Sequence, residues 1–209
     1  MKKVMLGAAV CAMAFSANAE EPVQASAFNS IYGGLGFGGS FLKSDADYFN
    51  KEGNHQDKMK ANRFVGSLVF GGGKVFNNNV YAGAELLMDW GKNKKIESYD
   101  DAKNYEGKWD VKGFIPQLSA KVGYAFKNDT LVYGKFGCAW SKVSWKNADD
   151  KGNSQTKSSV VLGLGAEKAF CKKFSTALEG DYNFGWKEYD KRVNKGWTVR
   201  ALVKYNVKY

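Results

Sequence analysis

The chain has 209 residues, of which 44% are apolar and 15% aromatic, with 24 glycines and 2 prolines. This length fits one domain or at most two small ones. Abundant glycine with scarce proline argues against a disordered chain, and the aromatic content argues against a small helical domain. The formal net charge is +10, but no zinc, helix-turn-helix or RNA-binding motif accompanies the lysines, so we expect no nucleic-acid partner.

The first residues predict an export signal. Two lysines precede an apolar run over residues 4–15, and the small-x-small tripeptide at residues 17–19 has the form of a cleavage site. The apolar run is too short to span a membrane as a helix. The predicted division of the chain is a signal peptide over residues 1–19, a short periplasmic lead-in over residues 20–28 and a barrel domain over residues 29–209.

Eight segments after this signal alternate between apolar and polar residues, as half-buried strands do. Each segment is long enough to cross a bilayer when it is tilted, and no apolar stretch is long enough for a spanning helix. The predicted strands cover residues 31–41, 63–72, 80–90, 113–126, 131–143, 159–170, 175–186 and 195–209.

The connections between the predicted strands alternate in length. Those after the second, fourth and sixth strands are short, and the other four are long and hydrophilic. This alternation indicates an all-β fold, an eight-stranded antiparallel up-and-down barrel with a short-turn end and a long-loop end. The predicted long loops cover residues 43–62, 91–112, 146–158 and 187–195.

The aromatic residues gather toward the two ends of the predicted strands. All six tryptophans lie at or near long-loop ends, and Trp90, Trp140, Trp186 and Trp197 share the apolar face. Because indole favours the membrane interface, these four predict an interfacial girdle, with a second aromatic level at the short-turn end. A soluble ligand-carrying barrel also has one apolar face, but it has no reason to sort its aromatic residues in this way. We therefore expect a transmembrane barrel.

The polar face of the same strands carries eight ionisable residues. With the apolar face toward lipid, they point into an interior that eight strands leave just wide enough for side chains. Four acids and four bases can form a paired network there, whereas unpaired charges would be costly. The network predicts a rigid polar plug, and the alternative is an ion path gated by rearranging pairs. The eight residues are Glu85, Lys121, Lys135, Glu167, Glu179, Asp181, Arg200 and Lys204.

The sequence carries no pattern that indicates a catalytic or metal-binding site. The one histidine, His55, lies in the first long connection, and no spacing fixes a nucleophile beside it. The acid pair Asp100 and Asp101 lies among competing lysines and fits no calcium-loop template. We expect no enzyme activity, no catalytic residues, no cofactor and no metal.

Several strand motifs resemble those of a known family. The motifs are VYAGAEL (80–86), VYGKFG (132–137), LGLGAEKAF (162–170) and ALEGDYNF (177–184). Together with the export signal and the alternating last strand, they resemble the small outer-membrane β-barrel family. That family includes the membrane domain of outer membrane protein A, the Opa-like proteins and small surface antigens of alphaproteobacteria.

The resemblance implies a location in the cell outer membrane, short periplasmic turns and four long extracellular loops. It specifies the fold better than the function, since this barrel hosts adhesins, weak porins, structural proteins and immune-evasion proteins. We expect a structural or surface-interaction protein with a charge-paired, plugged interior, and the alternative is a narrow porin for small ions or solutes. The expected partners are outer-membrane lipid, lipopolysaccharide, the barrel-assembly machinery during insertion and a host or environmental ligand at the loops.

The last predicted strand alternates up to its final residue, with Tyr205, Val207 and Tyr209 on one face. These residues resemble the assembly signal that bacterial outer-membrane barrels present to their insertion machinery. We predict that deletion of Tyr209 impairs barrel assembly more than an equal truncation of a long loop. Heat-modifiable migration on gels reports the folded barrel, and normal folding of the deletion variant would contradict the prediction.

Overall fold

The computed structural model describes residues 27–48, 55–91, 94–99, 105–111, 113–147, 152–171, 173–188, 191–193 and 195–208. The predicted signal peptide and most of the predicted lead-in lie outside these residues, so that division of the chain stays a prediction. Among the described residues, no helix is long and apolar enough to cross a membrane.

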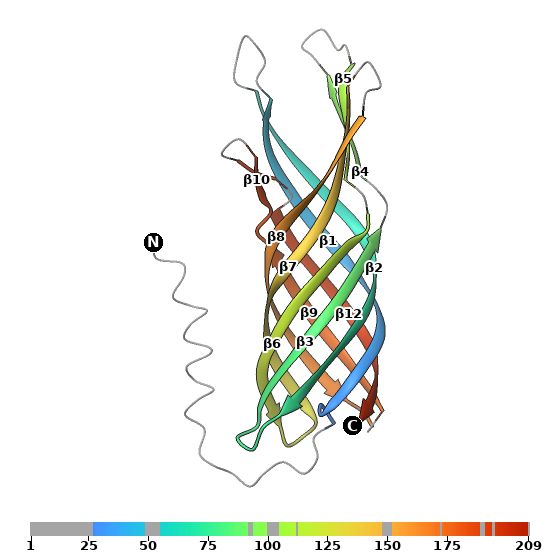
Figure 1. Ribbon diagram of the computed structural model, residues 1–209, viewed down its shortest axis with the longest axis vertical. Helices are drawn as coiled ribbons and strands as arrows, with labels where there is room; N and C mark the ends of the chain where they lie inside the picture. The colour runs from blue at the N-terminus through green and yellow to red at the C-terminus, as the bar shows by residue number, and fades with distance from the viewer. Residues whose placement is uncertain are drawn as a thin grey trace, which may run out of the picture.

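Eight antiparallel strands form the closed wall of a barrel, as the sequence predicts (Figure 1). Each wall strand pairs with the neighbour that precedes it, and β1 also pairs with β12 over its full wall length. The sheet therefore has no open edge along the wall. The wall strands are β1 (Ser30–Tyr48), β2 (His55–Val75), β3 (Val80–Gly91), β6 (Ile115–Phe126), β7 (Thr130–Asn147), β8 (Gly152–Ala169), β9 (Phe174–Asn183) and β12 (Lys195–Lys208).

The four long connections contain far more strand than the sequence predicts. The β1–β2 ladder continues to the pair Tyr48 and His55, and the β7–β8 ladder continues to the pair Lys146 and Gly152. The four long connections are present as predicted, but the predicted strand ends were too early. A hairpin beyond a bilayer can carry polar residues on both faces, which removes the alternation that marks a strand. The other two connections hold small hairpins, β4 (Lys94–Tyr99) with β5 (Tyr105–Val111), and β10 (Trp186–Glu188) with β11 (Lys191–Val193).

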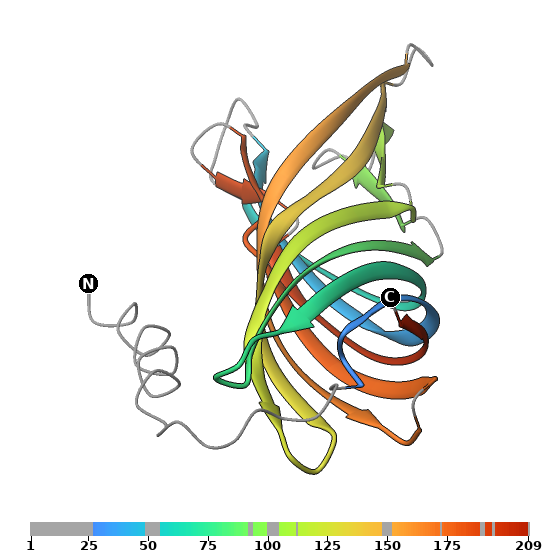
Figure 2. The same cartoon turned by 60° about the horizontal axis from the view of Figure 1, so that its bottom comes forward.

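These extensions lie at one end of the barrel, which we call the hairpin end. β5 pairs with the outer part of β7, so the β4–β5 hairpin enlarges the sheet beyond the wall. In Figure 2 the yellow and orange strands β7 and β8 extend beyond the neighbouring wall strands. The opposite end, which we call the turn end, has tight connections. Asn79 and Asp129 have φ of 62° and 57°, a left-handed conformation that Asn and Asp adopt more readily than most residues.

The two faces of the wall differ in polarity. Most outward side chains are apolar, and many large ones are strongly exposed, such as Phe64 at 71% and Leu164 at 67%. Soluble monomers rarely expose a continuous apolar surface of this kind, so the outward face needs an apolar medium. Inside the turn end, a cluster of buried apolar residues fills the barrel, which we call the turn-end cluster. It consists of Phe28, Val75, Tyr81, Ala125, Leu131, Tyr133 and Ala169.

Candidate functional site in the barrel interior

All eight predicted interior charges have buried side chains inside the barrel. None is more than 5% exposed. They come from six wall strands, so the closed sheet is what brings them together. A charge in this position needs partners from the protein, because removing it from water costs several kcal/mol. The eight residues are Glu85, Lys121, Lys135, Glu167, Glu179, Asp181, Arg200 and Lys204.

The centre of the interior holds two lysines and two glutamates. Lys121 and Lys135 lie directly opposite each other in the β6–β7 ladder, where two like charges repel. The Glu85 carboxylate bridges them, with Oε2 2.5 Å from Lys121 Nζ and Oε1 3.0 Å from Lys135 Nζ. Glu179 bridges them as well, at 3.0 Å and 2.6 Å. Each ammonium is therefore paired with both glutamates, and Lys135 Nζ also lies 3.3 Å from Asp181 Oδ2.

Two further groups of charges lie on either side of this centre. Toward the hairpin end, Arg200 pairs with Asp181 through Nη1 and with Asp89 through Nη2 at 2.7 Å. Toward the turn end, Lys204 Nζ lies 2.8 Å from Glu167 Oε2. The hydroxyl of Ser175 donates to the other oxygen of Glu167 at 2.6 Å. The charges thus form one chain of contacts along the interior.

Two buried tyrosines complete the centre. The Tyr32 hydroxyl donates to Glu85 at 2.9 Å, and the Tyr133 hydroxyl donates to Glu179 at 2.5 Å. Their rings also face cations, with Lys121 Nζ 4.2 Å from the Tyr133 ring centroid and Lys204 Nζ 4.6 Å from the Tyr32 centroid. Such contacts add to ion pairs when the cation is removed from water. Sequence reasoning missed both tyrosines, although both occupy the polar face of their strands.

Asp89 is a second interior group that sequence reasoning missed. It lies four residues after Glu85 on β3 and therefore on the same face, a spacing that was readable in the sequence. Asp89 accepts a hydrogen bond from Ser67 at 2.6 Å besides its pair with Arg200. The half-buried Arg63 lines a small cavity together with Asp89 at the hairpin end. Asp89 adds one acid and Arg63 adds one base, so the numbers of acidic and basic residues in the interior remain equal.

Most of these charged residues lie opposite a glycine in a neighbouring strand. The glycines make room, because a narrow interior cannot hold a large side chain at every inward position of neighbouring strands. A Cβ atom at Gly71 would lie 2.5 Å from the Tyr32 hydroxyl, and one at Gly165 would lie 2.5 Å from the Tyr133 ring. The pairs are Gly71 with Glu85, Gly83 with Lys121, Gly163 with Lys135 and Asp181, Gly165 with Glu179, Gly38 with Arg200, and Gly34 with Lys204.

The small cavity at the hairpin end measures about 20 Å³, room for roughly one water molecule. Its lining includes Arg63, Asp181 and Arg200. Among the buried side chains that the structure describes, Arg63 Nε, Asp181 Oδ1 and Arg200 Nε have no hydrogen-bond partner. Three of the residues that line this cavity thus each carry a polar atom that the network leaves without a partner.

Three of the four predicted interfacial tryptophans have described side chains, and all three lie on the outward face. Trp90, Trp140 and Trp197 are exposed on wall strands. The prediction that Trp186 ends the seventh wall strand was wrong, because that strand stops at Asn183. Gly185 has a left-handed φ of 66°, and its N–H donates to Asn183 Oδ1 at 2.7 Å, which ends the strand before Trp186 begins β10. The side chain of Trp186 is not among those described.

The predicted assembly signal is described in part. Tyr205 and Val207 are exposed on the outward face of β12, and the Tyr205 ring packs edge-on against Phe174 with centroids 5.2 Å apart. Tyr209 lies outside the described residues, as does the side chain of His55. Cys138 and Cys171 are both free and exposed.

We predict that Glu179→Gln destabilises the barrel by about 3–5 kcal/mol, because it leaves two buried lysines with one carboxylate fewer. Urea unfolding of the protein in lipid vesicles, followed by tryptophan fluorescence, measures this change. Asp129→Asn is the matched control, since Asp129 is exposed in a turn and its left-handed backbone suits Asn. Equal stability of Glu179→Gln and the wild type would show that the network contributes little.

Known proteins are similar to this chain in sequence. A family model for the outer membrane protein beta-barrel domain matches residues 7–205. Outer membrane protein A of Yersinia pseudotuberculosis is 28% identical over 185 residues, which cover 86% of this chain and 47% of that protein. The chain thus spans about half the length of that relative. The 31 kDa outer-membrane immunogenic protein of Brucella melitensis is 29% identical over 205 residues, covering 86% of this chain and 85% of that protein.

Solved structures share the fold at low sequence identity. The outer membrane protein OprG of Pseudomonas aeruginosa has a TM-score of 0.57 at 11% identity, covering 88% of this chain and 99% of that one. Neisserial surface protein A has a TM-score of 0.53 at 11% identity, covering 85% of this chain and 97% of that one. At this level of identity the likeness concerns the fold alone.

Proposed function

The chain belongs to the outer membrane protein beta-barrel family, and on that premise we propose that it is a structural or surface-interaction protein of the outer membrane. The observation that carries this proposal is the filled interior. The charge network occupies the centre of the barrel and the turn-end cluster occupies one end. A barrel filled in this way supports the hairpins that it presents at its other end.

The alternative function is a narrow porin, and one observation favours it. The small cavity between Arg63, Asp181 and Arg200 gives water a place in the interior at the hairpin end. From there an ion would still have to pass the central lysines and glutamates and then the turn-end cluster. We therefore favour the structural or surface-interaction role over ion conduction.

We predict that the wild-type protein in planar lipid bilayers gives a flat current trace, because no ion passes the paired charges without breaking several contacts. Fluorescently labelled protein confirms that insertion has occurred. Reproducible stepwise conductance of the wild type, altered by Glu85→Ala or Lys135→Ala but not by Asp129→Asn, would replace the proposal with the porin.

We further propose that the hairpins contact anionic saccharides, such as those of lipopolysaccharide or of a host surface. Taken together, the four predicted long loops carry more lysine and arginine than acids, and the stretch at residues 92–95 carries three lysines. Exposed positive charge attracts polyanions, and salt screens that attraction. We also propose that the bacterial barrel-assembly machinery inserts this protein into the outer membrane.

We predict that the double substitution Lys94→Gln with Lys95→Gln lowers the salt concentration at which the protein elutes from immobilised heparin. Each lysine near an anionic surface contributes about 1 kcal/mol. The control is Lys74→Gln with Lys127→Gln, which removes the same charge from the turn end. Equal elution of the two double variants would show that overall charge, and not the hairpins, determines retention.

A further inference from the structure

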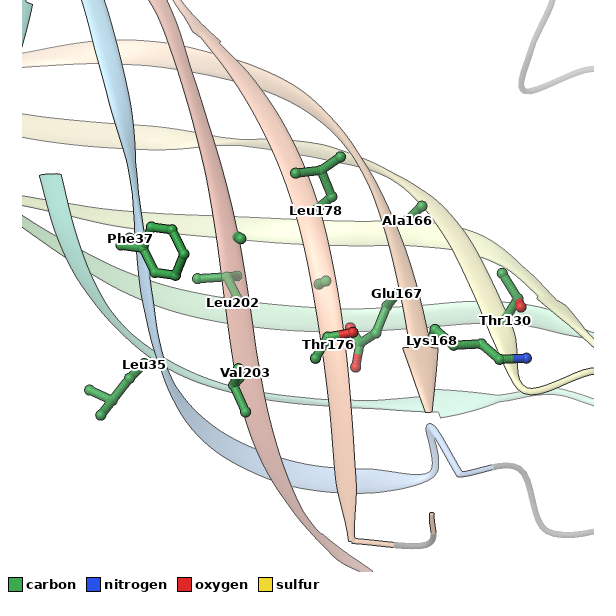
Figure 3. Close-up of a pocket in the computed structure, with 12 residues that line it drawn as sticks. Leu35, Phe37, Thr130, Ala166, Glu167, Lys168, Thr176, Leu178, Leu202 and Val203 are labelled. Atoms are coloured by element: carbon green, nitrogen blue, oxygen red, sulfur yellow. The ribbon is translucent and has the colours of Figure 1, made fainter. Parts of the chain in front are cut away.

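The outward face of the barrel is not uniform, because a groove of about 380 Å³ crosses β8, β9, β12 and β1 (Figure 3). It forms where small outward residues neighbour large ones. In the ladders, Ala166 lies beside Leu178, and Ala201 lies between Leu178 and Phe37. These four residues all line the groove, so its bottom is apolar.

One end of the groove is polar. Thr130, Lys168 and Thr176 occupy matched positions on β7, β8 and β9, so their side chains lie next to one another on the outward face. In Figure 3, Lys168 and Thr130 lie at the end of the groove that is farthest from Phe37. Lys168 is exposed, and its ammonium donates to the carbonyl of Asn128 in the β6–β7 turn. This contact keeps the cation at the turn end, and two of its three donors remain for a ligand.

We propose that this groove binds an anionic glycerophospholipid of the periplasmic leaflet, with an acyl chain over Ala166 and Ala201 and the phosphate at Lys168. The groove lies on the face that meets lipid, so an acyl chain is the apolar group available to fill it. Family membership places the short turns in the periplasm, and hence Lys168 at the headgroup level of that leaflet. The hydroxyls of Thr130 and Thr176 are further donors for phosphate oxygens.

The charges around the turn end favour an anionic lipid over a zwitterionic one. Lys74, Lys127 and Lys173 are exposed at the same end as Lys168. Among the turn residues that the structure describes, Asp129 is the exposed acid. A basic rim of this kind attracts anionic headgroups, and the groove gives one of those lipids a fixed place.

The test uses the intact protein, folded in detergent and mixed with equal amounts of phosphatidylglycerol and phosphatidylcholine that carry the same acyl chains. Native mass spectrometry then measures which lipid stays bound. We expect the wild type to retain phosphatidylglycerol preferentially. We expect Lys168→Gln to weaken that binding about fivefold, equivalent to about 1 kcal/mol for one lysine at an anionic surface. Ala201→Phe, which fills the groove, removes both lipids.

Two control variants change matched residues outside the groove. Lys74→Gln removes an exposed lysine at the same end, and Ala120→Phe enlarges an exposed outward alanine on β6. Both retain the lipid of the wild type if the groove is the site. Heat-modifiable migration confirms that each variant is folded, and Ala166→Leu replaces Ala201→Phe if the latter does not fold.

Three results would overturn the proposal. The first is equal retention of the two lipids by the wild type. The second is an equal loss of phosphatidylglycerol in Lys74→Gln and Lys168→Gln, which would indicate a diffuse basic rim. The third is a dimer that Ala201→Phe abolishes, which would assign the groove to a second copy of the chain. None of these results bears on the conductance or heparin measurements. The lipid site can therefore be refuted without refuting the proposed function, and the reverse.

Discussion

The closure of the sheet is the constraint on which the rest of this structure depends. A backbone N–H or C=O group without a partner costs several kcal/mol in hydrocarbon, so a sheet inside a membrane tolerates no open edge. β1 and β12 meet this demand with a continuous register from Ser30 opposite Lys208 to Lys43 opposite Lys195. Closing after eight strands makes the interior narrow, and every inward side chain has to fit that width.

The narrow width explains why charge and glycine occur together inside. A soluble core of this size would be filled with apolar residues, but the apolar face of each strand is already required outside, toward lipid. Many inward positions are polar, while apolar residues fill the turn end, and the buried polar residues have to satisfy one another. Glu85 and Glu179 do so by bridging the same two lysines, and the glycines opposite the charged residues supply the space. The lipid outside the wall, the narrow interior and the need to pair buried charges thus act together in determining which residues occupy the strands.

The wall of the barrel could be predicted from the sequence because lipid on one side and a polar interior on the other impose a strict alternation. The prediction of the strand bounds failed at the hairpin end, where no such contrast exists and the ladders of β1–β2 and β7–β8 continue unmarked. Trp186 was misplaced because one left-handed glycine ends β9 early. Tyr32 and Tyr133 were missed because aromatic residues were expected on the lipid face, although the alternation itself places both inside. The groove near Lys168 depends on which residues of four strands become neighbours, and a single strand does not show that.

The glycines opposite the charged residues have a consequence for how this chain can change. Charge and volume inside the barrel are specified on different strands, so a larger residue at Gly71 affects Tyr32, and through it a carboxylate on a third strand. Interior positions can therefore vary only as coordinated sets that span several hairpins. The extended hairpins lie outside this interior, although the β4–β5 hairpin is tied to β7 by the pairing of β5. Interior substitutions are thus constrained by buried charge and volume, whereas substitutions in the hairpins beyond the wall are constrained by strand pairing.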